Sequence, residues 1–144
     1  MVPNFLPYRG FGLKVLEYGG PPLVKEAFAA TRVLDRPVDI GDVIWTKPHG
    51  VGKAQRIGFV IMPYYWQGGK IEASRRLRYV IKRAFEQVQQ KGIKSVAMPH
   101  LAGGLYGYEP TDSGSIIFDE MVESLLQIDE VDPKYSLRDV TIMD

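Results

Sequence analysis

Residues 98–110 read Met-Pro-His-Leu-Ala-Gly-Gly-Leu-Tyr-Gly-Tyr-Glu-Pro, and this glycine-rich stretch is the most informative part of the sequence. The apolar run 93–98 predicts a buried strand, and the segment 114–127 predicts an amphipathic helix. The glycines therefore stand at a strand-to-helix junction, where a phosphate group would meet free backbone N–H groups. A tight turn whose glycines serve only its geometry is the alternative interpretation.

Strand and helix signals alternate on both sides of this junction. The long segment 70–90 carries apolar residues at helical spacing, and Gly92 is expected to end it. A Gly-Gly-Pro triplet at 19–21 is expected to separate two short helices. The predicted strands are 42–46, 57–62, 93–98 and 137–143, and the predicted helices are 13–18, 22–31, 70–90 and 114–127.

This alternation predicts an α/β domain of three layers, α/β/α, around a mixed and mainly parallel sheet, with 1–144 forming a single domain. The apolar run 57–62 is expected to be buried on both faces, and 93–98 is expected to form a buried strand. In such sheets, ligands bind beyond the carboxyl ends of the strands. The inward-facing residues are predicted to be Leu77, Val80, Ile81, Ala84, Phe85 and Val88 in one helix, and Ile117, Phe118, Met121, Val122 and Leu125 in the next.

Composition narrows the classes of function. The 144 residues include 18 Lys and Arg against 17 Asp and Glu, and this net charge of +1 argues against non-specific nucleic-acid binding. With no cysteine, disulfides, thiolate metal sites and a Cys nucleophile are excluded. His49 and His100 are the two histidines and are far apart, so we predict no metal site and no cofactor. No apolar run is long enough to cross a membrane, and we expect a cytoplasmic protein.

Five segments, in the right order, resemble motifs of the macro domain family. The resemblance covers about residues 2–143. One motif would be weak, whereas five in order are fairly specific. Residues 10–17 and 20–27 are similar to the first glycine-rich loop of the family and the helix that follows it. Residues 41–46 are similar to the Gly-Asp/Glu-x-x-x-Thr strand, and 56–69 to the apolar strand that ends in an aromatic residue and Gly-Gly. Residues 99–108 are similar to the phosphate loop.

The resemblance implies that the chain binds ADP-ribose or a related nucleotide diphosphate. The phosphate loop would hold the diphosphate through oriented backbone N–H groups. Its aromatic residues would lean over a ribose or a base. The loop residues that this carries over are Gly103, Gly104, Leu105, Tyr106, Gly107 and Tyr108.

A second set of ligand residues is implied near the N-terminus. By resemblance, Gly10, Phe11 and Gly12 would wrap the distal ribose and the neighbouring phosphate. Asn4 lies six residues before Gly10, the spacing at which the family places an Asn that contacts the ribose, and an amide both donates and accepts hydrogen bonds. Capping of a turn is the alternative role for Asn4.

Three departures from the family pattern bear on function. The sequence has no counterpart of the family's first strands or of the Asp that reads adenine. Because the family's second strand is central in the sheet, we expect the chain to form an oligomer that covers exposed strand edges. Lys14 stands where one hydrolytic branch has an Asp, and a cation cannot serve as the base. Binding is the leading hypothesis, with hydrolysis of an ADP-ribosyl or phosphate ester bond as a further activity. A fold relative that has lost the nucleotide is the alternative.

The remaining polar and aromatic residues each have two interpretations. His100 is a general acid or phosphate contact, or a loop histidine bonded to backbone. Asp112 and Ser113 are expected to cap the following helix rather than to act in catalysis. The aromatic run 63–66 is a stacking platform or the rim of a core. A solvated helix surface is favoured over a nucleic-acid site for the cations Arg75, Arg76, Arg78, Lys82 and Arg83.

Overall fold

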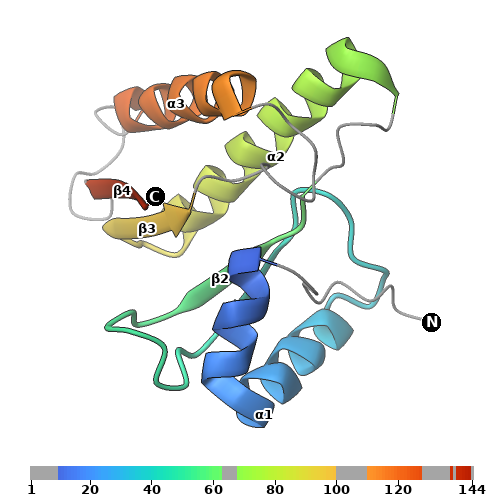
Figure 1. The fold of residues 1–144 in the computed structure, drawn as a ribbon, viewed down its shortest axis with the longest axis vertical. Helices are drawn as coiled ribbons and strands as arrows, with labels where there is room; N and C mark the ends of the chain where they lie inside the picture. Colours follow the sequence, from blue (N-terminus) through green and yellow to red (C-terminus); the bar gives the residue numbers. More distant parts are fainter. Residues whose placement is uncertain (1–9, 63–67, 100–109, 128–136, 138, 144) are drawn as a thin grey trace. The chain divides into compact units, whose positions relative to one another are not determined.

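The computed structural model describes residues 10–62, 68–99, 110–127, 137 and 139–143. The chain divides into two compact units, Met1–Ile61 and Met62–Asp144. The mixture of helices and strands confirms the predicted α/β class. In chain order the elements are α1 (Gly10–Val33), β1 (Val43–Thr46), β2 (Ile57–Val60), α2 (Gly69–Gln90), β3 (Ser95–Pro99), α3 (Pro110–Gln127) and β4 (Asp139–Met143) (Figure 1).

A broken helix, α1, opens the first unit. Gly20 has a φ of 74° and a ψ of −167°, which interrupt the helix, and Pro21 and Pro22 follow at once. Glycine adopts a positive φ at little cost because it has no Cβ, and proline fits the start of the new helical segment. The predicted division of this region at 19–21 is confirmed. The residues that α1 buries are Leu16, Leu23, Ala27 and Thr31.

β1 and β2 form an antiparallel pair in which Trp45 lies opposite Gly58. α1 contacts β1, and Ile44 of this strand is buried. The prediction that 57–62 is buried on both faces is wrong, because Gly58 is exposed and the other residues of β2 are half-buried. Within the described residues β2 pairs along one edge only, with β1, which leaves it less enclosed than a central strand.

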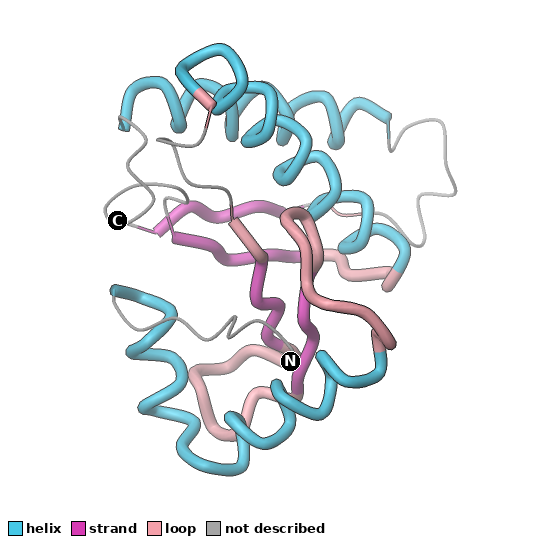
Figure 2. The backbone as a smooth tube through the Cα atoms, turned by 90° about the vertical axis from the view of Figure 1, so that its right-hand side faces the viewer, coloured by secondary structure: helices cyan, strands magenta, loops and turns pink. Residues whose placement is uncertain are grey.

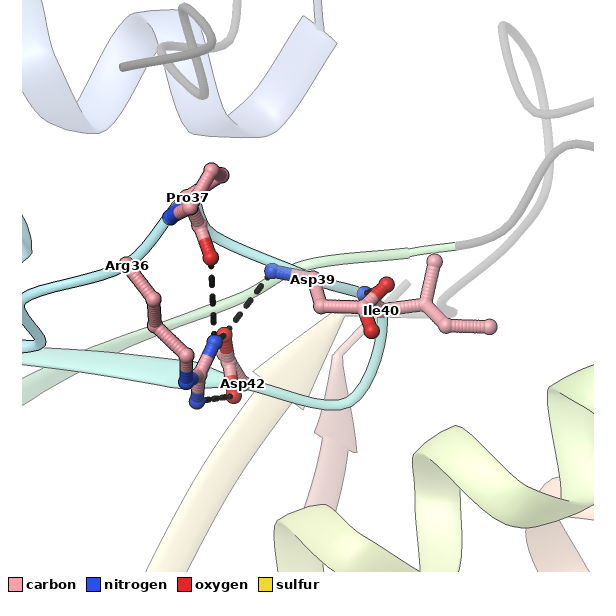
Figure 3. A network of polar contacts seen from close by, with 5 residues as sticks. All are labelled: Arg36, Pro37, Asp39, Ile40 and Asp42. Atoms are coloured by element: carbon pink, nitrogen blue, oxygen red, sulfur yellow. Dashed lines mark hydrogen bonds and ion pairs between the residues drawn. The ribbon is translucent and has the colours of Figure 1, made fainter.

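One carboxylate organises the loop that joins α1 to β1. Asp42 accepts two hydrogen bonds from the Arg36 guanidinium, at 2.8 and 2.9 Å, and a third from the Asp39 backbone N–H at 2.8 Å (Figure 3). Arg36 also donates to the Pro37 carbonyl at 3.0 Å, and the Ile40 N–H donates to the Asp39 carboxylate at 2.8 Å. The Gly-Asp pair at the start of this predicted strand therefore has a structural role: its carboxylate fixes the entry into β1.

In the second unit, α2 buries the apolar stripe that its periodicity predicts. Gly92 ends the helix as predicted: its φ is 67°, and its N–H donates to the Gln89 carbonyl at 2.9 Å. The Ile93 N–H also turns back, to the Val88 carbonyl at 3.2 Å. Ala84 is half-buried. The buried residues of α2 are Ala73, Leu77, Val80, Ile81, Phe85 and Val88.

β3 and β4 form a parallel pair in which Ser95 lies opposite Asp139. α2 and α3 contact each other and lie on the same side of this pair in both views (Figure 1, Figure 2). The expected burial of the strand at 93–98 is met only in part, because Ser95 and Ala97 are exposed whereas Met98 is buried. This alternation is typical of a strand with one covered face. The described strands thus form one antiparallel pair in the first unit and one parallel pair in the second.

α3 is rotated relative to the prediction. Phe118 was expected to face inward and is exposed, whereas Met121 and Val122 are half-buried. Three polar residues share the buried stripe of this helix, so an inward face chosen from apolar residues alone has the wrong phase. The described buried residues of α3 are Ser113, Ile116, Ile117, Glu120 and Ser124.

Among the described residues, no helix is long and apolar enough to cross a membrane.

Candidate functional site

The connection from β3 to α3 holds most of the predicted ligand residues. β3 ends at Pro99 and α3 begins at Pro110, so the glycine-rich stretch runs from the carboxyl end of a parallel strand to a helix N-terminus. The intervening residues 100–109 lie outside the described residues, and with them the predicted ligand residues 103–108 and His100. The placement of the two ends is the one that anion-binding loops of α/β proteins require.

The start of α3 corrects one sequence prediction. The helix begins at Pro110, four residues earlier than predicted, so Asp112 and Ser113 are its third and fourth residues and do not occupy the N-cap. Proline is favoured at the first helical position because its missing N–H would have no intrahelical partner there. Ser113 is fully buried. The N–H groups of the first turn of a helix have no intrahelical acceptor, and the helix dipole favours an anion at this position.

In the first unit, Gly10, Phe11 and Gly12 form the first turn of α1, and Asn4 lies outside the described residues. The N–H groups of a helix's first turn have no intrahelical acceptor, so this turn also offers donors. Lys14 follows it, is exposed, and lies with its Nζ 3.9 Å from a Glu17 carboxylate oxygen. The ligand role of Gly10, Phe11 and Gly12 stays a prediction, and the structure places these three residues at the start of α1.

A polar cluster that sequence reasoning missed joins α1 to the loop after β1. One oxygen of the Glu26 carboxylate accepts the Lys47 backbone N–H at 3.0 Å, and the other contacts His49 Nε2 at short range. The hydrogen bond from His49, followed by that from Lys47, lowers the pKa of Glu26 below its usual value. Because Glu26 and His49 are 23 residues apart on different elements, no linear signal connects them. The sequence pattern suggests no contact between His49 and Glu26, and His49 enters the sequence interpretation only in the argument about a metal site.

This cluster borders an open cleft of about 250 Å³ in the first unit. Thr46, one of its lining residues, is buried and donates from its hydroxyl to the Lys47 carbonyl at 3.0 Å. In the part of the chain that the structure describes, no three His, Asp or Glu side chains gather as a metal site would require. The residues that line the cleft are Glu26, Trp45, Thr46, Lys47, Gln55 and Arg56.

Two of the cationic residues of α2 form ion pairs within the helix. Arg75 pairs with Glu72 at 2.6 Å, and Arg83 pairs with Glu86 at 3.2 Å, each three residues apart on the helix. Lys82 is exposed. Such pairs are typical of a solvated helix surface. The aromatic run 63–66, the second candidate for ligand stacking, lies outside the described residues.

Comparison with known proteins identifies the family. The macro domain family model matches residues 6–117. An uncharacterized protein of Sulfolobus acidocaldarius is 29% identical over 99 residues, which is 69% of this chain and 51% of the relative. The chain therefore spans about half the length of that curated relative.

Solved structures agree on the fold. The Oceanobacillus iheyensis macrodomain with ADP superimposes with a TM-score of 0.77 at 21% identity, over 97% of this chain and 71% of that one. The Trypanosoma brucei macrodomain in complex with ADP-ribose gives a TM-score of 0.72 at 16% identity, over 99% of this chain and 55% of that one. The order of the elements, the sequence match and these structural matches agree, and the chain belongs to the macro domain family.

Proposed function

We propose that this chain binds ADP-ribose or a closely related nucleotide diphosphate. The observation that carries the proposal is the setting of residues 100–109, between the carboxyl end of the parallel strand β3 and the N-terminus of α3. A diphosphate needs several N–H donors in a small volume, and a glycine-rich loop followed by a helix provides them without cationic side chains. This fits a chain whose net charge is only +1.

In this proposal, the backbone N–H groups of 103–107 bind the diphosphate, and Tyr108 lies against a ribose or the base. Gly10, Phe11 and Gly12 hold the distal ribose and its phosphate through the first turn of α1, and the Asn4 amide hydrogen-bonds ribose hydroxyl groups. The structural neighbours support this ligand class, since one macrodomain was solved with ADP and another in complex with ADP-ribose.

Binding is proposed as the primary activity, ahead of hydrolysis. Cleavage of an ADP-ribosyl or phosphate ester bond needs a base that activates water near the distal ribose. The side chain that follows the first turn of α1 is Lys14, a cation that lies beside Glu17 at the surface.

The test is a calorimetric titration of the folded chain with ADP-ribose, ADP and AMP. We expect ADP-ribose to bind most tightly, ADP more weakly and AMP least. ADP lacks the contacts to the distal ribose, and AMP also lacks those to the second phosphate. Absence of binding heat for all three ligands, with an unchanged circular dichroism spectrum, would instead support a fold relative that has lost the nucleotide.

A further inference from the structure

The two helices of the second unit carry opposite charges. α2 contains six Lys or Arg and two Glu, a net charge of +4, whereas α3 contains four Asp or Glu and no cation, a net charge of −4. The helices contact each other, and Arg78 of α2 lies 3.5 Å from Asp119 and 3.8 Å from Glu120 of α3. Charge is therefore segregated by helix in this unit.

Large apolar side chains stand on the outer faces of the same two helices. On α2, Ile71 is 78% exposed and Tyr79 is 51% exposed; on α3, Phe118 is 57% exposed and Leu126 is 66% exposed. In each helix the two residues are eight positions apart, a spacing that keeps them on one face. Glu120 is buried on the opposite side of α3, so this helix exposes apolar groups while it encloses a carboxyl group. A solvated surface alone does not account for that pattern.

The two helices run in the same direction along their contact. Arg78 and Asp119 meet near the middle of both helices, and Gln89 Nε2 donates to the Ser124 carbonyl at 3.2 Å nearer the C-terminus of both. A two-fold axis that runs along the α2–α3 pair would place α2 of one copy over α3 of the other. Each residue would keep its height along the axis. The +4 helix would then face the −4 helix twice in one symmetric interface.

One cation and one carboxylate lie at matching levels of this face. Lys82 lies four residues after Arg78 on α2, and Glu123 lies four residues after Asp119 on α3, so each side chain is one helical turn beyond the Arg78–Asp119 ion pair. Both side chains are exposed, and neither forms a hydrogen bond or an ion pair with any residue that the structure describes. Across the two-fold axis, Lys82 of each copy would face Glu123 of the other.

We propose that this surface is the interface of a symmetric homodimer. Charge complementarity selects a second copy as the partner, because one copy supplies both the basic and the acidic helix in the arrangement that the other requires. The exposed apolar residues supply the buried area, and the charges set the register. The α2–α3 outer face comprises Ile71, Arg75, Tyr79, Lys82, Phe118, Asp119, Glu123 and Leu126.

Sedimentation velocity of the full chain over a range of concentrations tests the interface. We expect the mass to approach twice 16.2 kDa at high micromolar concentration. Phe118→Arg places a cation against the basic helix of the partner in both halves of the dimer, and should weaken association by about a hundredfold or more. Val33→Arg is the matched control, since Val33 is 84% exposed on α1, and it should leave the dimer intact. A parent chain of 16.2 kDa throughout, or equal effects of the two variants, would refute the interface.

A charge exchange tests the register separately. Lys82→Glu and Glu123→Lys should each weaken association by about tenfold, because each places like charges together twice. The double variant restores opposite charges, and its dissociation constant should return to within about threefold of the parent value. Both residues are exposed, so circular dichroism should not change. If the double variant loses as much association free energy as the two single variants together, the two-fold arrangement is wrong, whatever the result for Phe118→Arg.

Discussion

Arg36 and Asp42 form a bidentate ion pair, with Nη1 2.8 Å from Oδ2 and Nη2 2.9 Å from Oδ1. The paired geometry matches the planar guanidinium to the planar carboxylate and fixes both side chains. Asp42 is the more important member, because its Oδ2 also accepts the Asp39 N–H at 2.8 Å and its side chain is the more enclosed of the two. The loop between α1 and β1 therefore depends on one carboxylate.

Asp42→Ala should lower the free energy of unfolding by about 1.5–3 kcal/mol, since it removes charge-assisted hydrogen bonds and leaves the Asp39 N–H without that acceptor. Arg36→Ala should cost less, about 1 kcal/mol or below, because the Arg36 side chain is half-exposed. Urea unfolding monitored by circular dichroism measures both. Equal losses for the two variants would contradict the greater role assigned to Asp42.

Glu26 gives the stability of the chain a pH dependence. Because its folded-state pKa lies below the usual value of 4.5, the ionised carboxylate stabilises the fold. This contribution is complete above pH 4.5 and is lost as the pH falls through the folded-state pKa. Glu26→Gln should therefore be less stable than the parent at pH 7, and the difference should shrink as the pH falls below 4.5.

Urea midpoints for the parent and for Glu26→Gln across this pH range provide the measurement. Glu17→Gln is the control, since Glu17 is exposed and its carboxylate lies 3.9 Å from the exposed Lys14 Nζ. Its midpoint should follow the parent at every pH. A constant difference between Glu26→Gln and the parent from neutral to acidic pH would show that His49 and Lys47 do not favour the ionised carboxylate.

Gly58 is required by the side chains across the strand pair. A Cβ at this position would lie 2.9 Å from Trp45 Cζ3 and 2.9 Å from Val43 Cγ1, closer than carbon atoms pack. Gly58→Ala should therefore destabilise the chain by about 1–3 kcal/mol. In a Val43→Ala background one of the two obstructing atoms is gone, and the cost of Gly58→Ala should fall. Thermal melts of the four proteins measure this coupling, and strict additivity would argue against the predicted clash.

Gly104→Glu tests the phosphate loop. A carboxylate within 103–107 would fill the space of the ligand and repel its charge, and the loss of two or three charge-assisted hydrogen bonds should weaken ADP-ribose binding by about a hundredfold or more. Lys14→Ala is the control: Lys14 is exposed beside Glu17, and its removal should change affinity by less than about tenfold. If Gly104→Glu binds ADP-ribose as well as the parent, with an unchanged circular dichroism spectrum, the loop assignment is wrong.

The sequence predicts elements best where local signals agree. The predicted bounds of α2 differ from the observed ones by one residue at the start, since helical spacing marks the length of the helix and Gly92 marks its end. α3 was misphased, because Glu120 and Ser124 take buried positions that a hydrophobic pattern assigns to apolar residues. The position of the glycine-rich stretch after β3 was predictable, since a strand and a helix flank it. The contacts of Glu26 with His49 were not, because they depend on how α1 packs beside β1.

The two strand pairs differ in how far along the chain their partners lie. In the first pair, Thr46 and Ile57 are separated by a ten-residue connection, whereas in the second, Ser95 pairs with Asp139, 44 positions later. Closing a short connection costs less chain entropy than closing a long one, and a parallel pair must await its crossover. In a refolding experiment, amide protons of β1 and β2 should therefore gain protection from exchange before those of β3.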